Sequence, residues 1–317
     1  MSEQLYVLGH PIGHSKSPAM YNAAYGHLGL TWRYGFMDCA TEAEARAFLA
    51  ARDFLSINIT TPYKPLGVAE ADRLAPEAAL AGGANLLVRE GGALVARNVD
   101  GAGCVGYLQR EGVAFADATV AVCGTGPTAL AILEACLREG PARVTLLGRD
   151  GERARSVLRR FEETASSMSW GDAPDPAAAG ADGRIAAGRR GPARACRRVA
   201  VAEALSYEEG RAALAEADLV IDATPLGMAA GDPAPFDTAL IRAGQTVFDV
   251  VYGHGTTALV AAARAAGARA LDGQGMLVAQ AVASLRLVCA AAAVPVGASF
   301  DELFRIMAEA AGFDGLL

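Results

Sequence analysis

Lysine occurs at only two positions in this chain of 317 residues, Lys16 and Lys64, and every other basic residue is an arginine. An arginine guanidinium stays protonated near neutral pH, whereas a lysine amine can be tuned to exchange protons. Lys64 begins a predicted helix over residues 64–74, where a positive charge opposes the helix dipole. A lysine in that unfavourable place is better explained by proton transfer than by surface charge.

Asp100, within Asn98-Val99-Asp100-Gly101, is the candidate partner of Lys64. It follows a predicted hairpin, whose turn is at residues 90–92, and it precedes a predicted helix over 103–111. A carboxylate at this position can cap that helix, or it can act with the lysine as an acid/base pair. The residue types alone leave both interpretations open.

Two other segments offer polar side chains that suit a small polar ligand. Asn58 and Thr60 fall on one face if the predicted strand over 54–59 continues its alternation. Ser15 and Ser17 flank a turn before a predicted helix, with Ser17 as its N-cap. The two serine hydroxyls serve either as helix caps or as ligands for a polyol or a carboxylate.

Residues 118–147 predict a dinucleotide-binding βαβ unit. An apolar run ends at Gly124-Thr125-Gly126, an Ala/Leu-rich helix follows, and a second apolar run ends before Arg149 and Asp150. The glycines let the backbone approach a pyrophosphate, and the helix N-terminus supplies N–H donors. An arginine after the second strand favours the 2′-phosphate of NADP, whereas an acid there favours the ribose hydroxyls of NAD. The choice of cofactor therefore stays open.

Further apolar runs at 219–223, 246–251 and 268–271 alternate with helical segments. This alternation predicts an α/β fold with a doubly wound parallel sheet. Residues 165–198 are rich in Ala, Gly, Pro and Ser, which predicts a flexible surface insertion.

Composition excludes several classes of function. The net charge of −7 argues against nucleic acid or an anionic membrane as a partner. The six cysteines and four histidines show no metal-ligand spacing, so no metal is predicted. The N-terminus lacks the pattern of a signal peptide, and no run of 18 uninterrupted apolar residues occurs. We expect a cytoplasmic protein with a small-molecule substrate, either a monomer or a homodimer.

Several motifs, in order along the chain, resemble those of the shikimate dehydrogenases and their quinate-oxidising relatives. The motifs are Gly9-His10-Pro11-Ile12-Gly13-His14-Ser15-Lys16-Ser17-Pro18, Asn58 through Lys64, Gly83-Ala84-Asn85, Asn98-Val99-Asp100-Gly101, Ala223-Thr224-Pro225-Leu226-Gly227-Met228, Asp249-Val250-Val251-Tyr252 and Gly275-Met276-Leu277-Val278-Ala279-Gln280. The resemblance covers nearly the whole chain apart from the insertion.

The resemblance implies a split α/β substrate-binding domain, residues 1–103 completed by C-terminal helices in 276–317. It also implies a Rossmann-type NAD(P)-binding domain, residues 104–275, that carries the insertion 165–198. In this comparison Lys64 exchanges the proton of the reacting hydroxyl and Asp100 positions it. The residues implied to bind substrate are Ser15, Ser17, Asn58, Thr60, Asn85, Tyr252 and Gln280. Those implied to bind cofactor are Gly124, Thr125, Gly126, Pro127, Thr128, Arg149, Asp150, Thr224, Val250 and Gly273.

Four departures from the family pattern bear on the site. Val99 replaces a common threonine, and Pro127 replaces a glycine of the phosphate loop. Gly148-Arg149-Asp150 stands where NADP-specific members have Asn-Arg-Thr, and Gly253-His254-Gly255 follows Tyr252 where Asn-Pro is common.

The predicted reaction is the reversible NAD(P)-dependent reduction of 3-dehydroshikimate to shikimate. The alternatives are a quinate or dual quinate/shikimate dehydrogenase and, in another class, a non-catalytic sensor of a shikimate-pathway ligand.

Overall fold

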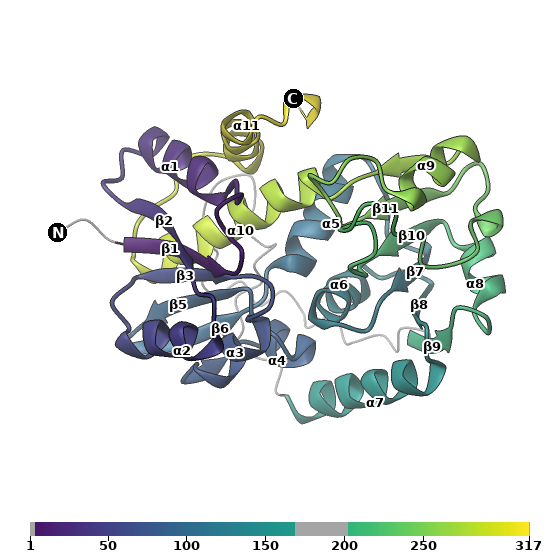
Figure 1. Cartoon of the computed structure of the whole chain (residues 1–317), viewed down its shortest axis with the longest axis horizontal. Coiled ribbons are helices and arrows are strands. Elements are labelled where there is room, and N and C mark those ends of the chain that lie inside the picture. Colours follow the sequence, from purple (N-terminus) through teal and green to yellow (C-terminus); the bar gives the residue numbers. More distant parts are fainter. Residues whose placement is uncertain (1–3, 169–201, 317) are drawn as a thin grey trace. The chain divides into compact units, whose positions relative to one another are not determined.

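The computed structural model describes residues 4–168 and 202–316. These residues form two compact units: the first holds 4–103 and 277–316, and the second holds 104–168 and 202–276. The boundaries between the units fall within two helices, α5 (Asp100–Arg110) and α10 (Gln274–Ala291) (Figure 1).

The first unit is built on a six-stranded mixed sheet. Its strands are β1 (Gln4–Gly9), β2 (Arg33–Asp38), β3 (Ser56–Ile59), β4 (Arg73–Leu74), β5 (Leu86–Glu90) and β6 (Ala93–Arg97), in the order β2-β1-β3-β5-β6-β4. Its other helices are α1 (Ser17–His27), α2 (Glu42–Ala51), α3 (Lys64–Ala69), α4 (Pro76–Ala81), α11 (Phe300–Ala311) and the 3-10 helix η2 (Asp314–Leu316). The predicted hairpin is confirmed, because β5 and β6 pair antiparallel.

One hydrophobic core of this unit joins the sheet to α2 and α3. Leu8, Ile57 and Leu87 from three strands pack with Leu49 of α2 and Leu66 of α3. These apolar side chains hold the end of β3 and the start of α3 in place, and these are the positions of Asn58 and Lys64.

The predicted helix over 64–74 is wrong in its second half. The helix α3 ends at Ala69, and Arg73 and Leu74 form β4, which pairs parallel with β6. The Asp72 N–H donates to the carbonyl of Leu94 at 2.9 Å. A free sheet edge offers these residues hydrogen bonds that local helix propensity does not anticipate.

The second unit is a doubly wound parallel sheet, as predicted. Its strands are β7 (Thr119–Cys123), β8 (Arg143–Gly148), β9 (Ala202–Ser206), β10 (Leu219–Asp222), β11 (Thr246–Asp249) and β12 (Arg269–Leu271). All pair parallel, in the order β12-β11-β10-β7-β8-β9. Its remaining helices are α6 (Pro127–Arg138), α7 (Gly151–Ser167), α8 (Arg211–Glu216), the 3-10 helix η1 (Thr238–Leu240) and α9 (Ala258–Ala265).

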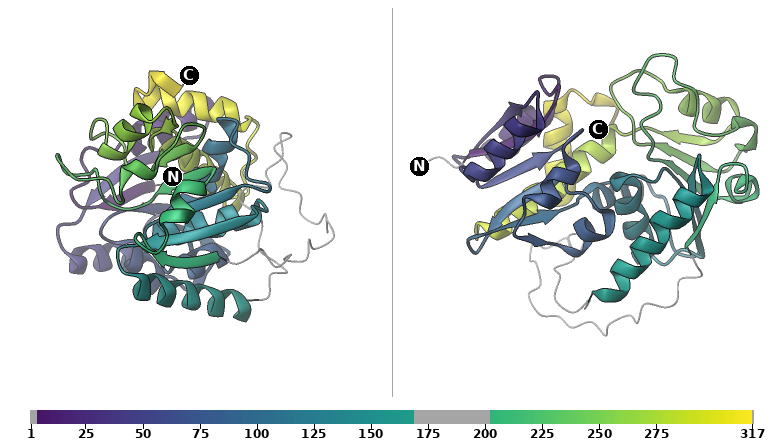
Figure 2. Two further views of the ribbon diagram at one scale, coloured as in Figure 1. Left: turned by 90° about the vertical axis from the view of Figure 1, so that its right-hand side faces the viewer. Right: turned by 60° about the horizontal axis from the view of Figure 1, so that its bottom comes forward.

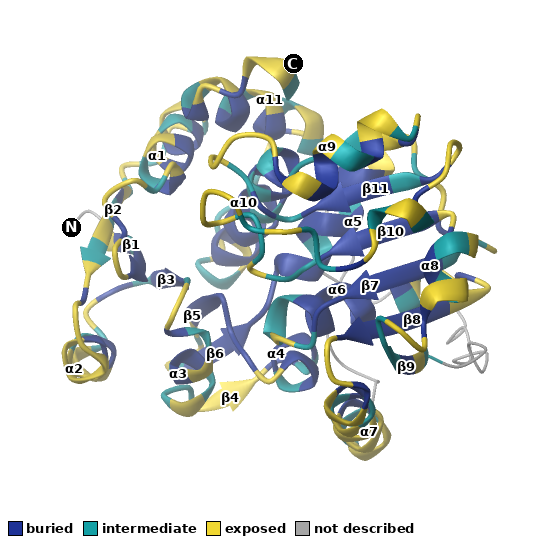
Figure 3. Cartoon of the chain, turned by 45° about the vertical axis from the view of Figure 1, so that its right-hand side comes forward, coloured by how far each residue is buried: buried dark blue, intermediate teal, exposed yellow. Residues whose placement is uncertain are grey.

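Helices cover both faces of this parallel sheet. The helix α7 packs on β8 and β9, whereas α9 packs on β11 and β12, and right-handed crossovers place these two helices on opposite faces (Figure 2). The strands β7, β8, β10 and β11 are buried along most of their length, and α7 and α9 each keep an exposed side (Figure 3). A strand that is covered on both faces has a continuous run of apolar residues, and the sequence shows such runs at these strands.

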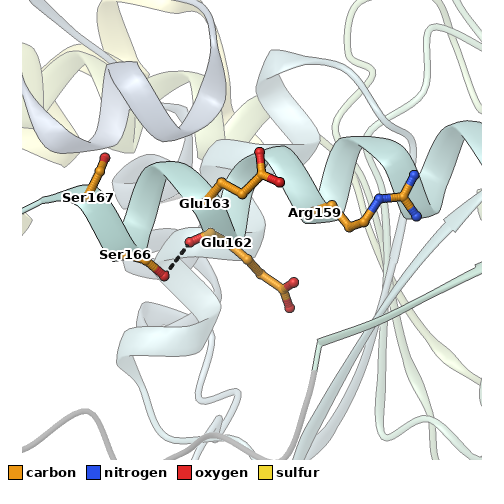
Figure 4. Close-up of a pocket in the computed structure, with 5 residues that line it drawn as sticks. All are labelled: Arg159, Glu162, Glu163, Ser166 and Ser167. Atoms are coloured by element: carbon orange, nitrogen blue, oxygen red, sulfur yellow. Dashed lines mark hydrogen bonds between the residues drawn. The ribbon is translucent and has the colours of Figure 1, made fainter.

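The insertion predicted from residue 165 onward begins too early. The helix α7 continues to Ser167, and the Ser166 hydroxyl donates to the Glu162 carbonyl at 2.8 Å (Figure 4). A serine within a helix commonly bonds back to the carbonyl four residues earlier in this way. Residues 169–198 of the predicted insertion lie outside the described residues.

The helix α10 is long and apolar enough, by length and composition alone, to cross a membrane. However, 67% of its apolar window is buried inside the structure, which is typical of a core helix. It belongs to the core of the first unit through Val278, Val282 and Leu285, which are all buried.

Gly103 allows α5 and α10 to approach closely. A Cβ atom at Gly103 would lie 2.6 Å from the Gln280 Cβ and 2.9 Å from the backbone N of that residue. We expect Gly103→Ala to lower the free energy of unfolding by about 1–3 kcal/mol, because the helix backbones must separate. Denaturant unfolding monitored by circular dichroism measures the change.

Gly26→Ala is the matched control for this substitution. Gly26 also lies within a helix, α1, but a Cβ there would meet nothing within 4 Å. This variant should be about 0.5–1 kcal/mol more stable than the wild type, since alanine restricts the unfolded chain. Equal effects at the two positions would contradict the packing argument.

Candidate active site

Lys64 and Asp100 form an ion pair within the first unit. The Nζ of Lys64 donates to Oδ2 of Asp100, and the two side chains are 18% and 10% exposed. Lys64 is the first residue of α3, and Asp100 is the first residue of α5. The pair is therefore largely shielded from bulk water, although each side chain keeps a small exposed surface.

A network of asparagine amides orients Asp100. The Asn85 Nδ2 donates to Oδ1 of Asp100 at 2.7 Å, and the Asp100 N–H donates to Oδ1 of Asn98 at 3.0 Å. Asn98 in turn donates to the Gly83 carbonyl at 2.8 Å. Both carboxylate oxygens of Asp100 thus accept from residues outside its own helix, which favours the acid/base interpretation over simple helix capping.

Tyr63 supports the lysine from the preceding position. Its hydroxyl donates to the Cys39 carbonyl at 2.8 Å, and its N–H donates to the Thr60 carbonyl at 2.8 Å. These bonds secure the turn between β3 and α3, so the starting point of the Lys64 side chain is well defined.

Asn58 uses most of its hydrogen-bonding capacity on the protein itself. Its Oδ1 accepts from the Tyr34 hydroxyl at 2.7 Å, and its Nδ2 donates to Oγ of Ser284 at 3.2 Å and to the Asn85 carbonyl at 3.3 Å. Oδ1 has two lone pairs, so it can accept one further hydrogen bond. Thr60, which directly follows β3, is partly exposed.

Ser17 is not the N-cap of α1, contrary to the sequence prediction. The cap is Lys16, and Ser17 is the first helical residue. The Ser17 N–H instead donates to Oγ of Ser15 at 3.2 Å, so the two serines meet in one turn. Ser15 is partly exposed, Ser17 is buried and Lys16 is exposed.

The two remaining predicted substrate residues lie in different units. Gln280, on α10, is partly exposed, and its Nε2 donates to the Leu277 carbonyl at 2.9 Å. Tyr252 follows β11 in the second unit and is also partly exposed. Every predicted substrate residue except Tyr252 therefore lies in the first unit.

The predicted cofactor residues all lie at the carboxyl ends of strands in the second unit. Gly124 follows β7 with φ +117°, and a Cβ there would lie 3.0 Å from the Ala223 carbonyl oxygen. Gly126 is the N-cap of α6 and no side chain caps that helix end. An exposed glycine before an uncapped helix N-terminus fits a dinucleotide pyrophosphate. Thr125 and Thr128, beside them, are partly exposed.

Thr224, Val250 and Gly273 follow three neighbouring strands, β10, β11 and β12. The Val250 N–H donates to the Asp222 carbonyl at 3.0 Å. A Cβ at Gly273 would lie only 2.0 Å from the Val250 carbonyl oxygen, so only glycine allows these two loops to touch. This edge of an open parallel sheet is where ligands bind in such folds.

Arg149 and Asp150 follow β8, and both are exposed. Asp150 is the N-cap of α7, and its Oδ1 accepts from the Arg153 N–H at 3.1 Å. Its negative charge is therefore partly balanced by the positive end of that helix.

The sequence prediction missed three residues that hold Asp100 or Asn58 in place. Asn98, Tyr34 and Ser284 make the bonds described above but were not predicted as site residues. Of the three, only Asn98 could have been found from the sequence, because it lies two positions before Asp100. Ser284 interrupts an otherwise apolar run, and Tyr34 shows no local pattern.

Two surface hollows lie away from these residues. One lies along α7, between Arg159 and Ser167 (Figure 4), and the other is lined by residues of α1 and β2 such as Asn22 and Arg33. Neither includes a predicted site residue. Within 4–168 and 202–316, no three His, Cys, Asp or Glu side chains group in a way that could hold a metal ion.

Comparison with known proteins identifies the family. Residues 7–87 match the shikimate dehydrogenase substrate binding domain. The shikimate dehydrogenase (NADP(+)) of Symbiobacterium thermophilum is 36% identical over 280 residues, which cover 87% of this chain and 85% of that protein. The enzyme of the same name from Rubrobacter xylanophilus is 34% identical over 285 residues, 88% of each. The chain belongs to the shikimate dehydrogenase family.

Solved structures of shikimate dehydrogenases share this fold. The shikimate 5-dehydrogenase of Thermus thermophilus, in complex with NADP(H) and shikimate, superposes with a TM-score of 0.74 at 24% identity, covering 98% of this chain and 100% of that one. A quinate dehydrogenase from Corynebacterium glutamicum, in complex with NAD, also has a TM-score of 0.74 at 24% identity, covering 97% and 99%. The fold is common to both kinds of dehydrogenase.

The structure shows how two departures from the shikimate dehydrogenase pattern are accommodated. Val99 is fully buried, and its N–H donates to Oδ1 of Asn85 at 2.8 Å, so this position serves the Asp100 network through its backbone. Pro127 lies in the first turn of α6, where the missing N–H breaks no bond within the helix.

Proposed function

We propose that this chain catalyses the reversible reduction of 3-dehydroshikimate to shikimate with NADP(H). The observation that carries this proposal is the shielded Lys64–Asp100 pair, held by Asn85, in a chain of this family. The curated relatives are named shikimate dehydrogenase (NADP(+)). An alcohol dehydrogenation needs a group that exchanges the hydroxyl proton, and in this proposal that group is Lys64.

The unit around Lys64 is, in this proposal, the substrate-binding domain, residues 1–103 with 276–317. Ser15 and Ser17 bind the substrate carboxylate, because their turn offers two neighbouring hydroxyls. The residues that hold the carboxylate or the ring hydroxyls are Asn58, Thr60, Asn85, Tyr252 and Gln280. The cofactor-binding domain is residues 104–275, with its phosphate loop at Gly124 to Thr128.

The proton moves between Lys64 Nζ and the reacting oxygen of the substrate. During reduction the Lys64 ammonium donates a proton to the oxygen, and during oxidation the amine takes the hydroxyl proton back. Asp100 accepts a hydrogen bond from Nζ and aims it. A bound nicotinamide cofactor supplies or accepts the hydride. Thr224, Val250 and Gly273 would line the nicotinamide side.

A steady-state assay with shikimate and quinate, each with NADP and NAD, tests the proposal. Turnover of shikimate with NADP is the expected result. Faster turnover of quinate would favour the quinate dehydrogenase alternative. Shikimate binding by calorimetry without turnover in any combination would overturn the proposal and favour a ligand sensor.

We infer a preference for NADP from the two residues between the end of β8 and the start of α7. The Asp150 carboxylate caps α7, which lessens its repulsion of a 2′-phosphate, and the exposed Arg149 is available to pair with that phosphate. We expect Arg149→Ala to lower kcat/KM for NADP by about 10- to 100-fold, the value of one charged hydrogen bond, with little change for NAD.

Arg143→Ala is the matched control, because Arg143 is an exposed arginine at the opposite end of the same strand. It should leave kcat/KM unchanged with both cofactors. If Arg149→Ala lowered kcat/KM equally with NADP and NAD, the arginine would not be recognising the 2′-phosphate.

We further infer a cytoplasmic enzyme whose partners are small molecules, with no nucleic acid or membrane bound, as a monomer or a homodimer. Size-exclusion chromatography with light scattering distinguishes the two oligomeric states.

A further inference from the structure

Two aspartates lie side by side inside the second unit. Asp222, the last residue of β10, is in parallel register with Asp249, the last residue of β11, and both are 0% exposed. Residues in register on adjacent strands point to the same face, and such strands lie about 4.8 Å apart. The two carboxyl groups are therefore close neighbours in the interior of the protein.

Each carboxyl group holds the first turn of the loop that follows its strand. Oδ1 of Asp222 accepts from the Thr224 N–H at 2.9 Å, and Oδ1 of Asp249 accepts from the Val251 N–H at 2.9 Å. Oδ2 of Asp249 also accepts from the Thr257 hydroxyl at 2.6 Å. The two loops are those that carry Thr224 and Val250.

Oδ2 of Asp222 is different, because it is buried without a hydrogen-bond partner among the described residues. A buried carboxylate oxygen that is left unpaired is strongly destabilising, whereas a protonated oxygen becomes a donor. A donor at this place suits the neighbouring Asp249, which has further lone pairs on its oxygens.

Hydrogen bonds from Thr224 favour the charged form of Asp222, but the titratable groups that face it bring no positive charge. The neighbours are Cys123 in register on β7, Tyr207 after β9 and Asp249 on β11, and Asp272 after β12 faces Asp249. Burial, together with the charge of Asp249, raises the pKa of Asp222 to about 7. Burial also raises the pKa of Asp249 and that of the Cys123 thiol. Arg149 acts on Tyr207 and is not among the groups that shift the pKa of Asp222.

We propose that Asp222 is a positioning residue that carries a proton on Oδ2 near neutral pH, and that the Asp222–Asp249 pair thereby holds together the two loops on the nicotinamide side. The role of these loops rests on the proposed function. When Asp222 loses its proton, two negative charges meet in the interior and the Thr224 and Val250 loops loosen. Cofactor binding then weakens as the pH rises.

The direction of the pH effect on folding follows from linkage. An aspartate in the unfolded chain has a pKa near 3.9, so the raised pKa of Asp222 means that the native state binds more protons than the unfolded state between about pH 4 and pH 7. The stability of the native state therefore falls as the pH rises through this window, and the loss is complete above the folded pKa.

Thermal unfolding of the cofactor-free protein between about pH 5 and pH 9 tests the proposal in wild type and Asp222→Asn. The asparagine keeps an acceptor for the Thr224 N–H, supplies an N–H donor in place of the proton and does not titrate. We expect the unfolding temperature of the wild type to fall with rising pH relative to that of the variant. Parallel curves would overturn the proposal.

Asp218→Asn is the matched control, at the other end of β10. The Thr119 N–H and hydroxyl donate to this exposed carboxylate and lower its pKa, so it stays ionised throughout the window. The difference between this variant and the wild type should not change with pH. A pH-dependent difference of the same size as in Asp222→Asn would count against the proposal.

Binding of NADPH, followed by its fluorescence, gives the second readout. The Kd of the wild type should rise by about tenfold between about pH 6 and pH 9, whereas that of Asp222→Asn stays flat. A failure of NADPH to bind the wild type at any pH would overturn the proposed function but leave the unfolding result on the aspartate pair intact.

Infrared spectroscopy of the wild type covers the case in which Asp222→Asn does not fold. A C=O stretching band of a protonated aspartic acid should be present in mildly acidic buffer and should disappear as the pH passes through neutrality. The absence of such a titrating band would overturn the proposal.

Discussion

Lys64→Ala should lower kcat by about 10²- to 10⁴-fold, the range expected when a general acid/base is removed. The amine that exchanges the hydroxyl proton is lost, and no other lysine can replace it, because Lys16 is the only other lysine in the chain. Substrate affinity should change little, since Lys64 acts mainly on the developing charge of the reacting oxygen. Stopped-flow absorbance of NADPH and calorimetry with shikimate measure the two quantities.

Lys64→Arg separates proton exchange from charge. The arginine can keep the ion pair with Asp100, but its guanidinium does not deprotonate near neutral pH. We expect it to be nearly as inactive as the alanine variant. Lys16→Ala is the control for an exposed lysine and should retain most of the activity. A Lys64→Arg variant with near wild-type kcat would show that Lys64 supplies charge rather than a proton.

The second large effect is expected at Asp100. Asp100→Asn removes the charge that aims the Lys64 ammonium, and kcat should fall by at least about 10²-fold, as for other residues that orient a proton-transfer group. The asparagine keeps an oxygen that can accept from Asn85, and the backbone N–H that donates to Asn98 is unchanged, so the fold should be kept, which circular dichroism verifies.

A double variant shows whether the two residues act as a unit. Lys64→Ala with Asp100→Asn should be no slower than Lys64→Ala alone, because the second change removes a partner that no longer has a role. Multiplying losses would mean that the aspartate acts independently of the lysine. Asp53→Asn, an exposed aspartate of the first unit, is the control and should leave kcat unchanged.

The parallel sheet of the second unit was predictable from sequence. Its central strands are buried on both faces, and they therefore appear as continuous apolar runs such as 118–123, followed by Gly124. The edge strand β9 (Ala202–Ser206) escaped prediction because it is only partly buried and includes Glu203. Strands at an edge are stabilised by one neighbour, so their sequence carries a weaker pattern.

The candidate site was predictable in its residue types but not in its network. Lys64 and Asp100 stand out by their chemistry, whereas Ser284 contacts Asn58 across more than 200 residues of chain. No local pattern encodes such a long-range contact, because it depends on how α10 packs in the first unit. The N-cap of α1 was predicted one position too late, at Ser17 instead of Lys16. A serine before a proline resembles an N-cap whether or not its hydroxyl caps the helix.

The divided first unit has a consequence for synthesis on the ribosome. Its N-terminal part, residues 4–103, leaves the ribosome long before residues 277–316, yet α1 packs against α11 and His27 pairs with Glu302 at 2.9 Å. The described residues of the second unit, 104–168 and 202–276, emerge in between and can fold as soon as they are complete. The nascent chain therefore exposes the surface of α1 that α11 covers until translation nears its end. We expect the unfinished protein to be most dependent on chaperones during this interval.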